Sequence, residues 1–139
     1  MKSESNIRPE KNYNIDVRED KAIITFFDNI QEITEDEETK YTYDTYELEL
    51  QNKENLEQEI KEKYQKYLEK AKSEEYKNLA KEIRTERDKL LVATDWTQLQ
   101  DTSLTDEEKE KYRIYRQKLK DVPQQDSFPY NVEFPKLEE

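Results

Sequence analysis

The first 52 residues alternate between apolar and polar positions in the manner of β-strands. From Tyr13 to Val17 every second residue is apolar, and a β-branched and aromatic run follows at residues 22–27. Both features are strand signals. The polar link at residues 18–21 favours a hairpin between the two runs. An acidic loop at residues 34–39 leads into a third run at 40–50, so residues 1–52 are predicted to form a small antiparallel β-meander of three or four strands.

Three tyrosines lie in the third run. Tyr41 and Tyr43 share one parity and Tyr46 has the other, which predicts a β-bulge near Asp44-Thr45 or a strand with both faces partly covered. Tyrosine offers a large contact area at low entropic cost, so the three rings are candidates for a partner-recognition surface. The alternative is that they pave an ordinary strand, where tyrosine is common.

Residues 53–93 have a helical pattern. Apolar residues recur at spacings of three and four, at Leu56, Ile60, Tyr64, Tyr67, Leu68 and Ala71, and again from Tyr76 to Leu91. The spacing is five around Ser73, but residues 53–91 contain no Gly or Pro. We therefore expect one continuous, highly charged rod of about 38 residues, roughly 57 Å long. The alternative is a helical hairpin that folds back on itself.

A rod of this length has more apolar surface than a small meander can cover. We therefore expect its stripe to contact a partner helix or a second copy of the chain, as in a coiled coil. The candidate partner-binding residues of the stripe are Leu56, Ile60, Tyr64 and Tyr67.

Residues 94–139 carry helix and turn signals. Asp95 is placed to cap a new turn, which leaves Trp96, the only tryptophan, to insert into a pocket. Thr105 and Glu108 form a capping-box pattern, and the helix that begins there should end before Pro123. We expect a short helical hairpin here.

An aromatic clasp is expected to close this hairpin. Tyr112 and Tyr115 lie on one side of the predicted helix, and prolines hold residues 128–135 as an extended strap that carries Phe128 and Phe134. The strap is expected to fold back over the Trp96 turn. The overall prediction is an α+β protein with three parts: residues 1–52, 53–93 and 94–139.

A series of short motifs in the C-terminal part resembles a known family. In order, they are Arg87-Asp88-x-Leu90-Leu91, Thr94-Asp95-Trp96-Thr97-Gln98-Leu99-x-Asp101, Leu104, Tyr115-Arg116-Gln117-x-Leu119-Lys120-Asp121-Val122-Pro123, Phe128-Pro129 and Phe134-Pro135. Over residues 84–135 this order resembles the phage tail assembly chaperone family. The family tends to have Trp where this chain has Tyr112 and Phe134. The resemblance implies a place in the phage tail or tail fibre and a role in assembly.

Composition removes most catalytic chemistry. The 139 residues contain no Gly, Cys or His. Disulfides, thiolate nucleophiles, thiolate or imidazole zinc sites and Ser-His-Asp machinery are therefore excluded, and so are glycine-rich phosphate loops. We expect a protein that is not an enzyme, with no catalytic residue, cofactor or metal.

Charge and hydropathy limit the classes of partner that the chain can bind. The net charge is −11, and residues 1–52 contribute −8 of it. A chain so acidic repels nucleic acid and anionic membrane surfaces, and no run approaches the roughly 20 apolar residues of a membrane span. Only 32% of the residues are hydrophobic, enough for one thin core. We expect a protein of the host cytoplasm whose work is to hold another macromolecule.

Three functions fit these features. The first is a phage tail protein that binds a tail-fibre or baseplate protein and assists tail assembly in the host cell. The second is a permanent structural adaptor of the virion tail. The third is an acidic DNA mimic that inhibits a host nuclease, for which the acidic run Glu35-Asp36-Glu37-Glu38 is the main support; a solvated charge run is the plainer interpretation.

Overall fold

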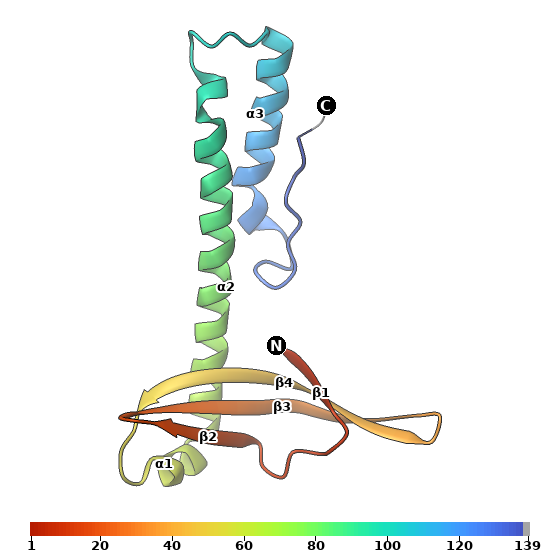
Figure 1. Cartoon of the computed structure of the whole chain (residues 1–139), viewed down its shortest axis with the longest axis vertical. Helices are drawn as coiled ribbons and strands as arrows, with labels where there is room; N and C mark the ends of the chain where they lie inside the picture. The colour runs from red at the N-terminus through yellow and green to blue at the C-terminus, as the bar shows by residue number, and fades with distance from the viewer. Residues whose placement is uncertain (138–139) are drawn as a thin grey trace. The chain divides into compact units, whose positions relative to one another are not determined.

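The chain forms two compact units joined within one helix. The computed structural model describes residues 1–137. The first unit spans Met1–Glu75 and the second Tyr76–Glu139, and helix α2 (Tyr64–Thr94) contributes to both. A four-stranded antiparallel sheet is followed by helices (Figure 1), which confirms the predicted α+β class.

The sheet has the strand order β1-β4-β3-β2. Strands β2 (Tyr13–Arg18), β3 (Lys21–Glu35) and β4 (Glu38–Gln51) form the predicted meander, with Ile24 paired to Ile15 on one side and Leu48 on the other. Strand β1 (Lys2–Ser5) pairs with the free side of β4. Its four residues are mostly polar, so alternation along the chain did not reveal it.

The turns of the sheet use left-handed residues other than glycine. Glu19 has a φ of 57°, and Asp36 and Glu37 have φ values of 50° and 66° at the tip of the β3–β4 hairpin. A β-bulge is present opposite Tyr43, next to Asp44, but the extra residue belongs to β3 and not to β4 as predicted. Two residues of β3, Asn29 and Ile30, lie between the pairs Asp28↔Asp44 and Gln31↔Thr42. The sequence pattern of β4 alone could not assign the extra residue to one strand or the other.

The core of the first unit lies between the sheet and the first helices. Helix α1 spans Leu56–Glu62 and α2 begins at Tyr64, so the predicted rod is continuous at Ser73 but broken at Lys63. The break lets both helices bring apolar residues onto the sheet. The buried set is Ala22, Ile24, Phe26, Leu48, Leu56, Ile60, Leu68 and Ala71.

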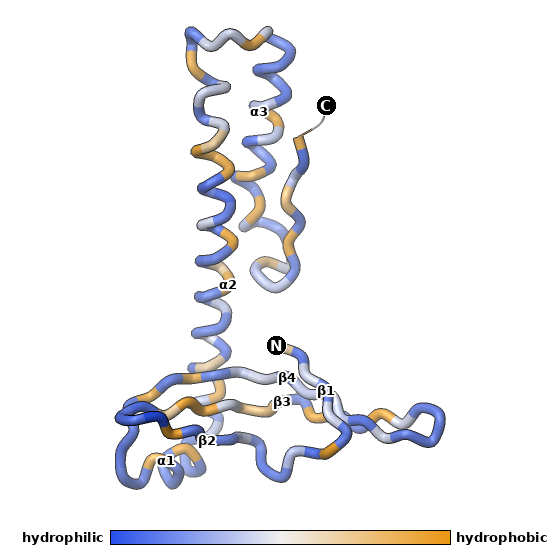
Figure 2. The backbone as a smooth tube through the Cα atoms, viewed as in Figure 1, coloured by the Kyte–Doolittle hydropathy of each residue, from blue (hydrophilic) through white to orange (hydrophobic). Residues whose placement is uncertain are grey.

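The second unit is a helical hairpin made by the end of α2 and by α3, whereas the predicted hairpin lay within residues 94–139. The end of α2 leads through the 3-10 helix η1 (Asp95–Gln98) to α3 (Asp106–Lys120), which starts at the predicted capping box of Thr105 and Glu108. A second 3-10 helix, η2 (Val122–Gln124), follows, and the chain then returns beside α3 (Figure 1). Hydrophobic stretches of α2 and α3 lie where the two helices run side by side (Figure 2). Leu119 and Val122 are fully buried.

Candidate partner-binding site

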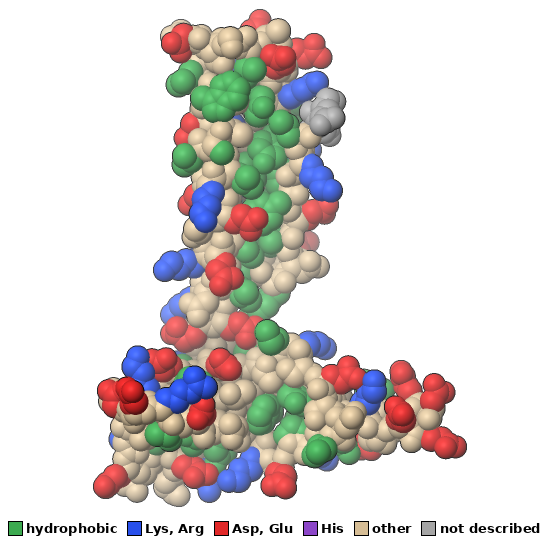
Figure 3. Space-filling view, in the orientation of Figure 1, with side chains coloured by type: hydrophobic (Ala, Val, Ile, Leu, Met, Phe, Trp, Pro, Cys, Tyr) green, Lys and Arg blue, Asp and Glu red, His purple; other side chains and the backbone are tan. Residues whose placement is uncertain are grey.

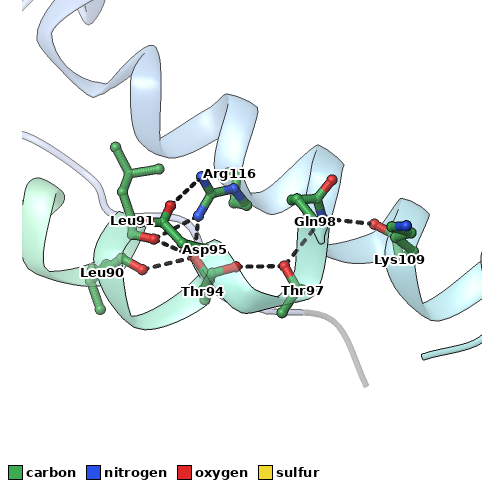
Figure 4. A network of polar contacts seen from close by, with 8 residues as sticks. All are labelled: Leu90, Leu91, Thr94, Asp95, Thr97, Gln98, Lys109 and Arg116. Atoms are coloured by element: carbon green, nitrogen blue, oxygen red, sulfur yellow. Dashed lines mark hydrogen bonds and ion pairs between the residues drawn. The ribbon is translucent and has the colours of Figure 1, made fainter. Parts of the chain in front are cut away.

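A polar network holds the end of α2 against α3 (Figure 4). Its centre is Arg116 of α3, whose Nη1 donates to the carbonyl oxygen of Leu91 at 2.6 Å and to Oγ1 of Thr94 at 2.8 Å. Its Nη2 donates to Oδ1 of Asp95 at 2.7 Å. The arginine side chain is 14% exposed. The carbonyl of Leu91 is one of the last in α2, where helix carbonyls lack a partner within the helix. Arg116 supplies one partner, and Thr94 Oγ1 supplies a second at 3.2 Å.

The turn after α2 is fixed by hydroxyl and amide groups. Thr94 Oγ1 donates to the carbonyl of Leu90 at 2.8 Å, and Thr97 Oγ1 donates to the carbonyl of Thr94 at 2.6 Å. Gln98 Nε2 then donates to Thr97 Oγ1 at 3.1 Å and to the carbonyl of Lys109 in α3 at 3.2 Å. The motif residues from Thr94 to Gln98 therefore bind α2, η1 and α3 into one rigid turn.

Two predictions about this turn were wrong. Asp95 does not cap η1: the N-cap is Thr94, whose side chain makes no capping hydrogen bond to η1, and the Asp95 carboxylate accepts from Arg116 instead. Trp96 does not insert into a pocket: its side chain is 48% exposed, and Thr97 is the buried residue. The Thr97 hydroxyl can be buried because it keeps a hydrogen bond to the Thr94 carbonyl.

The exposed tryptophan belongs to an apolar surface at this end of the unit. Val92 is 70% exposed and Leu99 is 55% exposed, and both lie within four residues of Trp96 along the chain. We call Val92, Trp96 and Leu99 the tip patch. Hydrophobic side chains gather over the end of α2 and η1 in the space-filling view (Figure 3). Val92 and Leu99 were not among the predicted binding residues, although their spacing of four and three from Trp96 was a usable signal.

The tip patch has a firm base. The Trp96 ring lies 6.0 Å, centroid to centroid, from the ring of Tyr112 in α3. Trp96 also follows Asp95 directly, and Asp95 is held by Arg116. The indole is therefore supported from one side while its other side faces solvent.

The remaining clasp aromatics do not gather around Trp96. The guanidinium carbon of Arg84 lies 5.2 Å from the ring centroid of Phe128, and the Phe128–Pro129 peptide bond is cis. Tyr115 and Phe134 line openings beside α3. The strap does fold back, but the aromatic side chains form separate contacts and not the predicted single cluster. The reason is that the strap runs along α3, whereas Trp96 lies beside the other end of that helix.

The predicted partner-binding stripe is largely used inside the first unit. Leu56 and Ile60 are buried in the core, so the expectation that the stripe needs a partner was wrong for them. Tyr64 packs its ring 5.7 Å from that of Phe26. The break at Lys63 is the physical reason, since it turns α1 onto the sheet.

Tyr67 belongs to a polar contact at the edge of the same core. Its hydroxyl donates to Glu59 Oε1 at 2.6 Å, and Lys53 forms an ion pair with the other carboxylate oxygen. The hydrogen bond from Lys53 and that from Tyr67 lower the pKa of Glu59 to about 2. Hydrogen bonding to Glu59, together with burial, raises the pKa of Tyr67.

The three strand tyrosines are half-buried on the sheet. Tyr43 packs edge-on against Phe27, with ring centroids 5.4 Å apart. The ammonium of Lys72 lies 5.5 Å from the Tyr46 ring centroid and forms an ion pair with Asp28 at 2.8 Å. These contacts fit the alternative interpretation, in which the three tyrosines cover the surface of an ordinary strand. A role for Tyr41, Tyr43 and Tyr46 in partner binding stays a prediction.

The described residues contain neither a membrane-spanning helix nor a metal-binding cluster. Within residues 1–137, no helix is long and apolar enough to cross a membrane. The same residues place no group of three or more acidic side chains in a position to hold a metal ion.

The C-terminal part of the chain matches a known family. Residues 80–137 match the family model described as phage tail assembly chaperone protein. No curated protein and no solved structure matches the chain. The matched range contains the whole Arg116 network and the tip patch, and it includes the motifs that first suggested the resemblance. Residues 80–137 are thus similar to phage tail assembly chaperone proteins.

Proposed function

We propose that the protein binds a tail-fibre or baseplate protein of a bacteriophage and assists tail assembly, and that the tip patch is its contact surface. The proposal is carried by one observation: the residues that match the assembly chaperone family are those that hold Val92, Trp96 and Leu99 in the open. The protein acts in the host cell while tails are being built.

The tip patch has the properties of a binding hot spot. Tryptophan is enriched among the residues that dominate interface energies. Burial of exposed apolar area contributes roughly 25 cal/mol per Å². A rigid turn loses little conformational freedom on binding, and the Arg116 and Thr97 bonds keep this turn rigid before any partner arrives. The partner is expected to offer a complementary apolar surface that is exposed before the tail is complete.

A pair of matched variants tests the contact surface. Val92→Asp with Leu99→Asp places two carboxylates in the tip patch without touching the Arg116 network. Ile7→Asp with Val17→Asp is the control, because both residues are exposed apolar side chains of the first unit and the change in net charge is the same. Each variant is co-expressed with tail-fibre and baseplate proteins of the same phage, and complexes are isolated on a tag of the chain.

The expected result is loss of the complex for the tip-patch pair and retention for the control pair. Capture at the unmodified level by the tip-patch pair would show that the contact lies elsewhere. Loss with both pairs would point to net charge and not to the patch.

A second measurement separates an assembly factor from a permanent adaptor. Mass spectrometry of purified virions should detect only traces of a protein that leaves after assembly. Stoichiometric presence in the particle would favour the adaptor role instead.

A further inference from the structure

Helix α3 is rich in cationic side chains, although the chain as a whole is acidic. Residues 92–139 contain seven Lys and Arg side chains, of which six lie between Lys109 and Lys120 and the seventh is Lys136. Glu110 is the one acidic residue of the segment 109–120. Six of these seven cations therefore lie on one helix, on a chain with a net charge of −11, and Lys136 directly follows the strap.

The two arginines of α3 are already engaged. Arg116 belongs to the network with α2, and Arg113 forms an ion pair with Glu110 at 2.7 Å. The lysines differ. Lys111 and Lys118 form no ion pair with any residue between Met1 and Leu137, the part of the chain that the structure describes, and the same holds for Lys136. Their charges are available to a ligand.

These three lysines converge on an apolar floor. Lys111, Lys118 and Lys136 line one opening together with Ile114 and Tyr115. Ile114 is 44% exposed there. Lysine side chains also present apolar stems below their ammonium groups. The opening therefore combines three cations with a hydrophobic contact at its centre.

The opening continues as a groove between α3 and the strap. The continuation has a volume of about 570 Å³, shares Lys118 and Lys136, and has Phe134 in its wall. Its far end carries the carboxylates of Asp121 and Glu133. The sign of the charge thus changes along the groove, which is cationic beside Lys111 and anionic beside Asp121.

We propose that this groove binds an extended acidic segment of another protein, in which an aliphatic side chain stands between two carboxylates. Lys111 and Lys118 are seven residues apart on α3, or about 10 Å along the helix axis. Acidic residues four apart in an extended chain are about 13 Å apart and face the same side. Flexible lysine stems take up the difference. The residue midway between the carboxylates then meets Ile114.

A protein segment fits better than nucleic acid. The chain as a whole repels polyanions with evenly spaced phosphates, because its net charge is −11. Phosphates also bring no aliphatic group to Ile114. The carboxylates of Asp121 and Glu133 repel a polyanion that extends to that end of the groove. They therefore limit the length of any bound polyanion and the direction in which an acidic segment lies. This inference goes beyond the assembly role, since it concerns a surface other than the tip patch.

Fluorescence anisotropy of a labelled peptide tests the proposal on the full chain. The probe is Thr-Glu-Thr-Leu-Thr-Glu-Thr, and a second probe replaces its Leu by Ser. The test variant is Lys111→Glu with Lys118→Glu. The control is Lys66→Glu with Lys70→Glu, because both are exposed lysines of α2 in the first unit without an ion pair among the described residues, and the net charge changes equally.

The expected result is weaker binding of the leucine peptide by roughly tenfold or more in the Lys111 pair and by less than about threefold in the control pair. Ile114→Ser should weaken binding of the leucine probe but leave that of the serine probe nearly unchanged. Circular dichroism spectra identical to the parent chain would show that each variant is folded.

Three outcomes would overturn the proposal. They are no binding of the leucine peptide at low salt, equal losses in the two lysine pairs, or tighter binding of a thymidine heptanucleotide than of the peptide. A chain that ends at Leu137 lacks the acidic residues 138 and 139 and should bind at least as well; weaker binding by that chain would also contradict the assignment.

Discussion

Replacement of Arg116 by Met should destabilise the second unit strongly. Met keeps most of the side-chain volume but removes every donor. The bond to the Leu91 carbonyl is charge-assisted and partly buried, and such bonds contribute about 1.5–3 kcal/mol. The ion pair with Asp95 is largely solvent-exposed and contributes about 0.2–1 kcal/mol. The bond that Arg116 Nη1 donates to Thr94 Oγ1 is left out of the sum, which is therefore a lower value. The sum is about 2–4 kcal/mol.

Urea unfolding followed by tryptophan fluorescence measures this loss directly. The chain has one tryptophan, Trp96, and it lies in the same unit against Tyr112. With a urea dependence of about 2 kcal/mol per M, the midpoint should fall by roughly 1–2 M. Arg113→Met is the matched control, because Arg113 lies on the same helix, is exposed, and pairs only with Glu110 at i−3.

Equal midpoints for the two arginine variants would refute the reasoning. That result would mean that the Arg116 bonds exchange for water without cost and that hydrophobic packing of Leu119 and Val122 alone holds the hairpin. A change in the slope as well as the midpoint would indicate altered compactness and require a second probe.

Two further predictions concern the first unit. Ile60→Ala should lower its stability by about 2–5 kcal/mol in thermal unfolding followed by circular dichroism, because Ile60 is fully buried; a loss below about 1 kcal/mol would contradict the core assignment. The pKa of Glu59 is lowered from 4.5 to about 2, so its contribution to stability is present above pH 4.5 and is lost as the pH falls toward 2. Glu59→Gln should therefore flatten the acid limb of the melting-temperature curve, whereas the exposed Glu54→Gln should follow the parent chain.

Features encoded by neighbouring residues could be predicted from the sequence. The hairpin of β2 and β3 was visible from alternation on both sides of a short polar link. The capping box at Thr105 and the end of α3 before Pro123 were also visible, because caps and prolines act on the residues next to them.

Features set by distant contacts could not be predicted. β1 exists because β4 offers it an open side, and nothing within residues 2–5 reports that. The break at Lys63 has no Gly or Pro signal; it follows from the need to bring Leu56 and Ile60 onto the sheet. Tertiary packing overrode a favourable helical pattern there.

The candidate site shows the same division. The motif marked Thr94 to Gln98 and Arg116 as unusual, but their hydrogen-bond roles depended on how α3 lies against α2. Trp96 was predicted to be enclosed, but its neighbour Thr97 is the buried residue. In a short 3-10 turn, a shift of one position decides which side chain is buried. Aromatic character alone could not decide it.

The glycine-free turns have a consequence for engineering. Glu19, Asn29, Asp36, Glu37 and Asn55 all hold positive φ angles without a glycine among them. Left-handed backbone in residues with a Cβ costs on the order of 1 kcal/mol at each position, less for Asn and Asp. Glu37→Gly and Glu19→Gly should therefore raise the thermostability of the sheet unit without any change to its hydrophobic core.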